Sequence, residues 1–127
     1  LPRLTAAYYY GISYQPVPVD VVMEGKEMTL EVGKHTLHLV HTPGHTPGSI
    51  AGYTDLAGTR VLFGQDIHGP FDPSWGSDIS QWKQSMLTLL DLRPDILCEG
   101  HFGIYRPRER AAKFIKSQLA RYGHPGS

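Results

Sequence analysis

Two histidines lie four residues apart in the run His41-Thr42-Pro43-Gly44-His45-Thr46-Pro47-Gly48, which otherwise holds only small residues and prolines. The preceding segment, Lys34 to Val40, has the composition of a β-strand, so the chain is expected to leave a sheet and turn sharply here. Such a turn projects imidazoles from the edge of a sheet. Imidazole nitrogen is the commonest protein ligand for a metal ion, so this run predicts metal binding.

Two further residues with ligand chemistry follow apparent strands. Asp66 comes after the apolar segment 60–64, and His101 comes after the segment 95–98. Three ligands at strand ends, His45 among them, predict one shared site. Histidine and aspartate ligands suit zinc, iron and manganese alike, so the residue types do not identify the metal. The alternatives are a turn cap for Asp66 and ordinary surface or core positions for the two histidines.

The elements that must position these residues are short and rich in β-formers. Glu24-Gly25 and Gly33-Lys34 are typical turns, and they separate the first three of five predicted strands. Together the five strands predict an antiparallel meander: Val19 to Met23, Met28 to Val32, Thr36 to Val40, Ser49 to Thr54 and Thr59 to Phe63.

Two amphipathic helices follow the meander. Apolar residues recur every three to four positions from Ile79 to Leu90, which predicts a helix capped by Ser77 or Asp78 and ending near Leu92. A short strand is expected at 95–98. A second helix is expected to start near Pro107, a residue that suits the first helical position, and to stop at Gly123. The fold class is therefore α/β (α+β), a mostly antiparallel sheet with two covering helices. Residues 1–18 are expected to form an irregular or helical lead-in to a domain at 19–127.

Three strings carry a resemblance to a known family: HTPGHTPGS at 41–49, LFGQD at 62–66 and LCEGH at 97–101. In this order and spacing they resemble the metallo-β-lactamase superfamily, and the first string is most similar to its glyoxalase II-like members. The resemblance implies one half of an αββα sandwich. It also implies a metal-dependent hydrolase that cleaves an ester, thioester or lactone through a metal-bound hydroxide, with two zinc ions in the complete site.

The resemblance also implies residue roles. His45 would complete the histidines of the first metal, Asp66 would bridge both metals as a catalytic residue, and His101 would bind the second. His41 is expected to support these ligands without binding the metal itself. His68, Tyr53 and Trp75 are candidates for a pocket that binds a small-molecule substrate, and ordinary loop or sheet packing is the alternative for them.

The family carries most of its ligands in an HxHxDH string, and none occurs in these 127 residues. The chain is therefore expected to be the C-terminal half of a truncated domain. Half a sandwich exposes an apolar sheet face, so the expected partner is the missing N-terminal half or a second copy in a homodimer. The alternative function is a truncated, non-catalytic metal-binding or structural module.

The composition of the chain narrows the classes of function and partner that remain. Lys plus Arg and Asp plus Glu both number 12, so no overall charge favours nucleic acid or a membrane surface. No apolar run reaches the roughly 20 residues that span a bilayer. Cys98 is the only cysteine and cannot form an internal disulfide, so a cytoplasmic location is expected.

Overall fold

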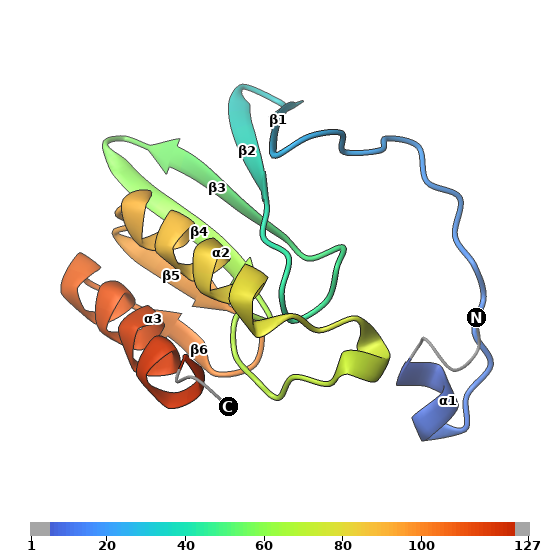
Figure 1. Cartoon of the computed structure of the whole chain (residues 1–127). Helices are drawn as coiled ribbons and strands as arrows, with labels where there is room; N and C mark the ends of the chain where they lie inside the picture. The colour runs from blue at the N-terminus through green and yellow to red at the C-terminus, as the bar shows by residue number, and fades with distance from the viewer. Residues whose placement is uncertain (1–5, 124–127) are drawn as a thin grey trace.

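The structure is a computed structural model that describes residues 6–123. It contains one six-stranded sheet whose strands lie side by side in chain order (Figure 1). Neighbouring strands are antiparallel except for β4 and β5, which are parallel. The predicted fold class, a mostly antiparallel sheet with two covering helices, is confirmed. The strands are β1 (Glu27–Val32), β2 (His35–His41), β3 (Ile50–Leu56), β4 (Thr59–Gln65), β5 (Ile96–Glu99) and β6 (Gly103–Tyr105).

The parallel pair decides where the candidate ligands meet. Helix α2 (Ile79–Asp91) connects β4 to β5, and such a crossover is what two adjacent parallel strands require. Gln65 at the end of β4 is in register with Glu99 at the end of β5. The residues that directly follow these two strands, Asp66 and the segment 100–102, therefore leave the sheet at the same edge.

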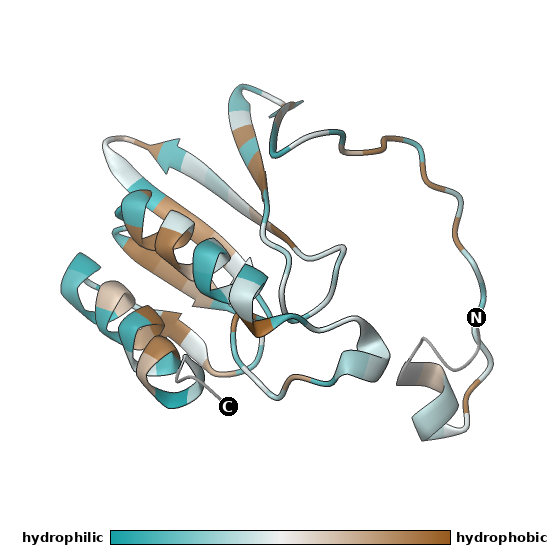
Figure 2. Ribbon diagram, in the orientation of Figure 1, coloured by the Kyte–Doolittle hydropathy of each residue, from teal (hydrophilic) through white to brown (hydrophobic). Residues whose placement is uncertain are grey.

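Helices α2 and α3 (Arg108–Tyr122) lie against one face of the sheet (Figure 1). Asp78 caps α2 by accepting a 2.9 Å hydrogen bond from the backbone N–H of Gln81, as predicted. Helix α3 begins near Pro107 as predicted, with Pro107 as the cap residue directly before its first helical residue, Arg108. Gly123 ends α3 by donating its N–H to the Leu119 carbonyl at 2.7 Å. Figure 2 shows apolar residues along β4 and β5, beneath the two helices.

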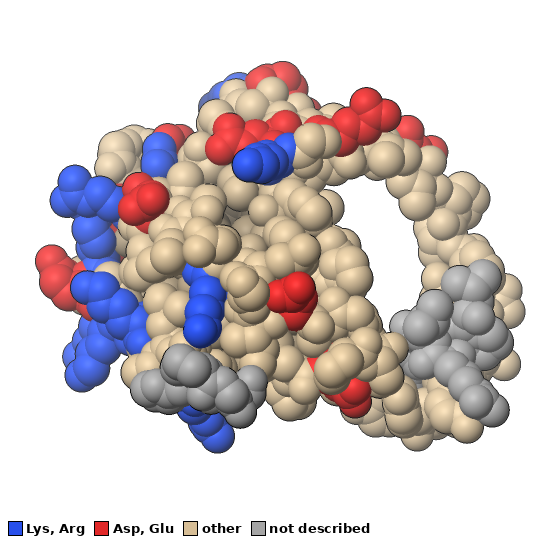
Figure 3. Space-filling view, viewed as in Figure 1, with Lys and Arg blue, Asp and Glu red and all other residues tan. Residues whose placement is uncertain are grey.

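The segment before β1 differs from the prediction. Residues 11–26 form no strand, although Val19 to Met23 was predicted to be one. Val19 is 73% exposed and Val22 is 68% exposed. A strand is stabilised by backbone hydrogen bonds to a neighbouring strand, and no described strand pairs with this segment. Its β-favouring residues alone are therefore not enough to form a strand. After the short helix α1 (Ala6–Tyr10), the segment forms an arm that stands away from the sheet (Figure 3). Residues 1–5 and 124–127 of the predicted lead-in and domain lie outside the described residues.

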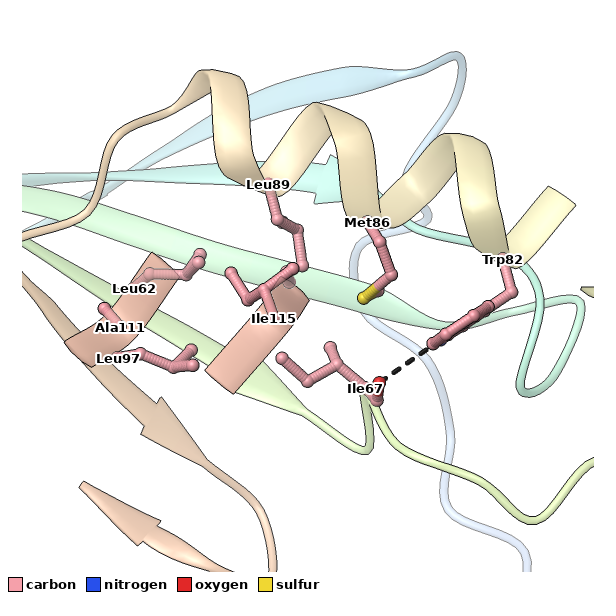
Figure 4. Packing of buried hydrophobic residues seen from close by; sticks show 9 residues of the cluster. Leu62, Ile67, Trp82, Met86, Leu89, Leu97, Ala111 and Ile115 are labelled. Carbon is pink, nitrogen blue, oxygen red and sulfur yellow. Dashed lines mark hydrogen bonds between the residues drawn. The ribbon is translucent and has the colours of Figure 1, made fainter. Parts of the chain in front are cut away.

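The core lies between the sheet and the two helices. Ala51, Leu62 and Leu97 point toward the helices from three strands and are fully buried. Burying a leucine side chain contributes about 1.5–3 kcal/mol, so the cluster is the main support of the fold. Trp82 also donates its indole N–H to the Ile67 carbonyl at 3.2 Å (Figure 4). The rest of the cluster comprises Met86, Leu89, Ala111 and Ile115.

The other face of the sheet is also apolar, but no described element covers it. Side chains alternate between the two faces of a strand, so Phe63, next to buried Leu62, points away from the helices. Phe63 is 46% exposed, and Ile104, in the outermost strand, is 65% exposed. The core thus supports one face only, as expected for half of a two-sheet sandwich.

Candidate metal centre

The loop that carries His45, residues 42–49, is fastened to the N-terminal end of α2. The Gly44 carbonyl accepts the backbone N–H of Asp78 at 2.8 Å. Ser77 donates its hydroxyl to the His45 carbonyl at 2.6 Å, and Ser85 donates its hydroxyl to the carbonyl of Pro43 at 2.7 Å. These bonds hold the loop backbone against a helix packed on the core, so His45 has a rigid support.

Two further features of the loop explain its unusual composition. Gly44 has a φ of 148°, and a Cβ there would overlap the Trp82 backbone, so only glycine allows this approach. His41 donates a ring N–H to the Pro47 carbonyl at 2.8 Å, which closes the loop on itself. His41 therefore supports the loop that carries His45, and its predicted role beside the metal ligands stays a prediction.

Asp66 is presented by a tight turn at the end of β4. The strand register shifts between Phe63 and Gln65, and Gln65 has a φ of 54°, in the left-handed region that non-glycine residues rarely adopt. The Gln65 carbonyl accepts N–H groups from Ile67 at 3.1 Å and from Gly100 at 3.0 Å. These two bonds pin the turn to the neighbouring strand end and aim Asp66 along that edge.

Asp66, His68 and His101 form a group in which one ligand atom of each residue lies within 4.8 Å of the others. His101 Nε2 and Asp66 Oδ1 are 3.1 Å apart. The side chains of Asp66 and His101 are 43% and 61% exposed. The Asp66 carboxylate is therefore still in contact with solvent, and this chain alone does not impose the desolvation cost of a buried charge on it. The structure thus brings together two of the three predicted ligands and adds His68 to them.

His45 borders this group. Its ring centroid is 6.0 Å from that of His68. Its Nδ1 atom is buried and has no hydrogen-bond partner among the described residues. Buried polar atoms are nearly always satisfied, and a metal ion satisfies a ring nitrogen as well as a hydrogen bond does.

Glu99 is a central residue of the site that the sequence interpretation missed. Its side chain is fully buried, and one carboxylate oxygen pairs with His68 Nδ1. The other oxygen accepts the backbone N–H groups of His101 at 2.6 Å and Phe102 at 2.7 Å. The alternation of side chains along a strand could have predicted that Glu99 is buried, because Glu99 lies two residues after buried Leu97 and must face the same side of the sheet. A buried acid at a strand end needs partners, and two of the partners here are the candidate ligands His68 and His101.

The aromatic residues predicted to line a pocket divide into two places. Trp75 lies in the short 3-10 helix η2 (Pro73–Trp75) with its ring 6.3 Å from that of His45. Tyr53 instead stacks on His38 at 4.6 Å and lies under the Arg60 guanidinium at 4.5 Å. It pairs with Leu62, four residues before Asp66, which corresponds to roughly 13 Å along a strand. Trp75 therefore borders the candidate site, whereas the contacts of Tyr53 are elsewhere.

Three acids in the described part of the chain have a lowered pKa. Asp72 caps η2, and its pKa is lowered by the backbone N–H of Ser74. Asp55 and Asp95 lie at the opposite edge of the sheet, where β4 and β5 begin. The backbone N–H of Arg60 donates to Asp95 at 2.8 Å, and this bond, together with the Arg108 guanidinium, lowers the pKa of Asp95. The Arg60 side chain likewise lowers the pKa of Asp55 through a 2.8 Å hydrogen bond. These groups fasten the far end of the sheet and take no part in the site.

The donor set fits a divalent transition metal. Two or three imidazoles and one carboxylate are the ligands typical of catalytic zinc sites, which keep an open coordination position. The buried ring nitrogen of His45 and the grouping of Asp66 with His68 and His101 both support the fit. The open side of the group leaves room for ligands from outside this chain.

The fold, unlike the sequence, resembles that of known proteins. No family model and no curated protein matches the sequence. Among solved structures, the inverting sec-alkylsulfatase of a Pseudomonas species superposes with a TM-score of 0.72 at 19% identity. A metallo-β-lactamase of Cronobacter sakazakii superposes with a TM-score of 0.70 at 18% identity. An archaeal metallo-β-lactamase superfamily protein of Sulfolobus tokodaii gives 0.63 at 16% identity.

The chain has the fold of half a metallo-β-lactamase domain. The match covers 99% of this chain and 51% of the archaeal protein, and 88% of this chain and 52% of the Cronobacter enzyme. For the alkylsulfatase the shares are 84% and 18%. The chain thus spans about half or less of each of these structures. At such identities the likeness shows the fold, and the site residues above are argued from this chain alone.

Proposed function

We propose that this chain is the C-terminal half of a metal-dependent hydrolase that cleaves an ester, thioester or lactone of a small-molecule substrate. The observation that supports the proposal best is the grouping of Asp66, His68 and His101 at one sheet edge, with His45 beside them. The matched structures include a sulfatase and β-lactamases by name, which favours hydrolysis of small molecules.

The proposed metals are two zinc ions, with iron or manganese as alternatives. His45 would bind the first, Asp66 would bridge the two, and His101 would bind the second. Bound in this way, a metal pair supplies an activated water and polarises the bond to be cleaved. The chain itself contributes a rigid loop for His45, a pinned turn for Asp66 and an aromatic border, Trp75, on which an apolar part of a substrate can rest.

The proposed partner is an N-terminal half carrying HxHxDH, or else a second copy of the chain. Either would cover the apolar sheet face that exposes Phe63 and Ile104. The length of the matched superfamily proteins favours the N-terminal half. No helix in the described range 6–123 is long and apolar enough to cross a membrane. The cytoplasmic location and the absence of a nucleic-acid or membrane partner stay predictions.

A non-catalytic metal-binding module is the second candidate. It is favoured by the openness of the group, since the His101 side chain is 61% exposed and three ligands leave a divalent ion incompletely held.

The test uses the complete protein as its gene encodes it. Metal content and hydrolysis of a panel containing an aryl ester, a thioester, a lactone and a sulfate ester are measured for wild type, Asp66→Ala and His101→Ala. We expect metal in the wild type and a loss of activity of more than about 100-fold in either variant, since even partners outside the ligand shell cost about 10–100-fold. His35→Ala removes an exposed histidine at the start of β2 and serves as the control. Metal binding without hydrolysis of any substrate would favour the module, and absence of metal would contradict both candidates.

A further inference from the structure

We propose that His68 is a further metal ligand, binding through Nε2, and that buried Glu99 is the residue that positions it. The inference rests on the proposed function and extends it, because it assigns the metal a ligand from the segment that follows β4. Substrate contact, the role predicted for His68 from the sequence, is the competing role.

The carboxylate of Glu99 accepts hydrogen bonds from the residues that follow it. Its side chain has no solvent exposure. One of its oxygens already receives two backbone N–H groups, from His101 and Phe102. Backbone N–H groups only donate, so this oxygen is an acceptor. The other oxygen faces His68 Nδ1.

This contact favours one tautomer of the His68 ring. An ionised carboxylate only accepts hydrogen bonds, and opposite an ionised Glu99 the Nδ1 atom of His68 carries the hydrogen and donates it. A neutral imidazole has one N–H, so Nε2 is left with a free lone pair. A carboxylate on one ring nitrogen and a metal on the other is the usual arrangement of histidine ligands, because the carboxylate fixes the ring orientation and makes the ligating nitrogen more basic.

The position of His68 agrees with this role. One of its ligand atoms lies within 4.8 Å of those of Asp66 and His101. Ligands with bonds of about 2.0 Å in a tetrahedral site are about 3.3 Å apart, and Asp66 and His101 are already at 3.1 Å. A metal held by all three residues would require His68, whose side chain is 12% exposed, to approach the other two ligands.

Glu99 also connects His68 to His101. The same carboxylate pairs with the His68 ring and accepts the backbone N–H of His101. Binding of one metal by both histidines would therefore depend on a single buried group.

The test measures Zn²⁺ affinity, by competition with a chromophoric chelator, and the visible absorption of the Co²⁺-substituted protein. It compares wild type, His68→Ala, Glu99→Gln and the double variant in the complete protein, with His35→Ala as control. In Glu99→Gln the amide oxygen can still accept both backbone N–H groups, but the amide NH₂ then faces Nδ1. The His68 ring must then carry its hydrogen on Nε2, where it blocks the metal.

We expect His68→Ala to weaken zinc binding by about 100-fold and to change the Co²⁺ spectrum. Glu99→Gln should weaken binding by about 10–100-fold with no loss of fold, and the double variant should be no weaker than His68→Ala, since both act through one ligand. Unchanged zinc affinity and Co²⁺ spectrum in Glu99→Gln would overturn the proposal, even if His68→Ala fails to fold. If wild type binds metal and Asp66→Ala abolishes it while both new variants bind normally, only this inference fails. If wild type binds no metal, the proposed function fails with it.

Discussion

At the scale of single residues, the site depends on a glycine as much as on its ligands. Gly100 lies between Glu99 and His101, and a Cβ placed on it would come within 2.6 Å of Asp66 Oδ1 and 3.1 Å of the Gln65 carbonyl carbon. The carboxylate of Asp66 therefore occupies the space that any side chain at position 100 would need. The close approach of the two strand ends requires glycine here.

Gly100→Ala is expected to move the Asp66 carboxylate, because a carboxylate end shifts more easily than backbone. We expect zinc affinity to fall by about 10-fold or more, in the range found when support of a ligand is lost, with a smaller effect on thermal stability. Gly48→Ala is the matched control, since an added Cβ there meets nothing within 4 Å. Equal zinc affinity in Gly100→Ala and Gly48→Ala would show that Asp66 is not held by this contact.

At the scale of elements, the two ends of the parallel pair β4 and β5 have different roles: one end carries candidate ligands, and the other holds the strands in register. The C-terminal edge carries Asp66 and His101, and the N-terminal edge is closed by Asp95. This carboxylate accepts the backbone N–H of Arg60 at 2.8 Å and pairs with Arg108 at 2.8 Å. It therefore joins the start of β4, the start of β5 and α3, and it keeps the two strands in the register that the site requires.

The lowered pKa of Asp95, caused first by the Arg60 backbone hydrogen bond, gives a pH prediction. A carboxyl whose pKa is lower in the folded state stabilises the fold above its unfolded pKa, about 3.9, and that contribution is lost as pH falls through the folded value. Asp95→Asn should therefore be less stable than wild type at pH 7, and the gap should shrink below about pH 4. Urea unfolding at a series of pH values measures this, with Asp91→Asn, on the exposed end of α2, as control. A gap that does not change with pH would exclude the contribution of the charge.

At the scale of the whole molecule, one face of the sheet is covered by helices and the other face is uncovered in the described part of the chain. The helices cover the first, and Trp82 and Leu89 of α2 are fully buried against it. The second exposes Phe63, Ile104 and Leu56, and an apolar surface of this kind normally marks an interface. The group of Asp66, His68 and His101 lies at the edge of the same sheet and is open as well, so one partner would complete both the sheet face and the candidate site.

The isolated 127-residue chain is therefore expected to self-associate. Sedimentation velocity should show species larger than the 14.1 kDa monomer, and the double variant Phe63→Lys/Ile104→Lys should shift them toward monomer. Leu87→Lys, at a residue 47% exposed on α2, is the control and should leave the distribution unchanged. A wild-type chain that is monomeric at ordinary concentrations would contradict an interface on this face.

The sequence by itself determined the local elements and the candidate ligands. Most strand segments, the cap at Asp78 and the stop at Gly123 follow from near-neighbour patterns, and turns after strands marked His45, Asp66 and His101. Short-range sterics and hydrogen bonds control these features, so a single sequence contains the information.

Tertiary structure decided what depends on a distant partner. Val19 to Met23 has strand composition but lacks a strand to pair with. The parallel pairing of β4 and β5 brought Asp66 beside His101 and the buried Glu99 carboxylate beside His68. The antiparallel pairing of β3 kept Tyr53 beside His38 and Arg60. The two site contacts, Asp66 with His101 and Glu99 with His68, join residues more than 30 positions apart, and pairing at that distance is a property of the folded chain as a whole.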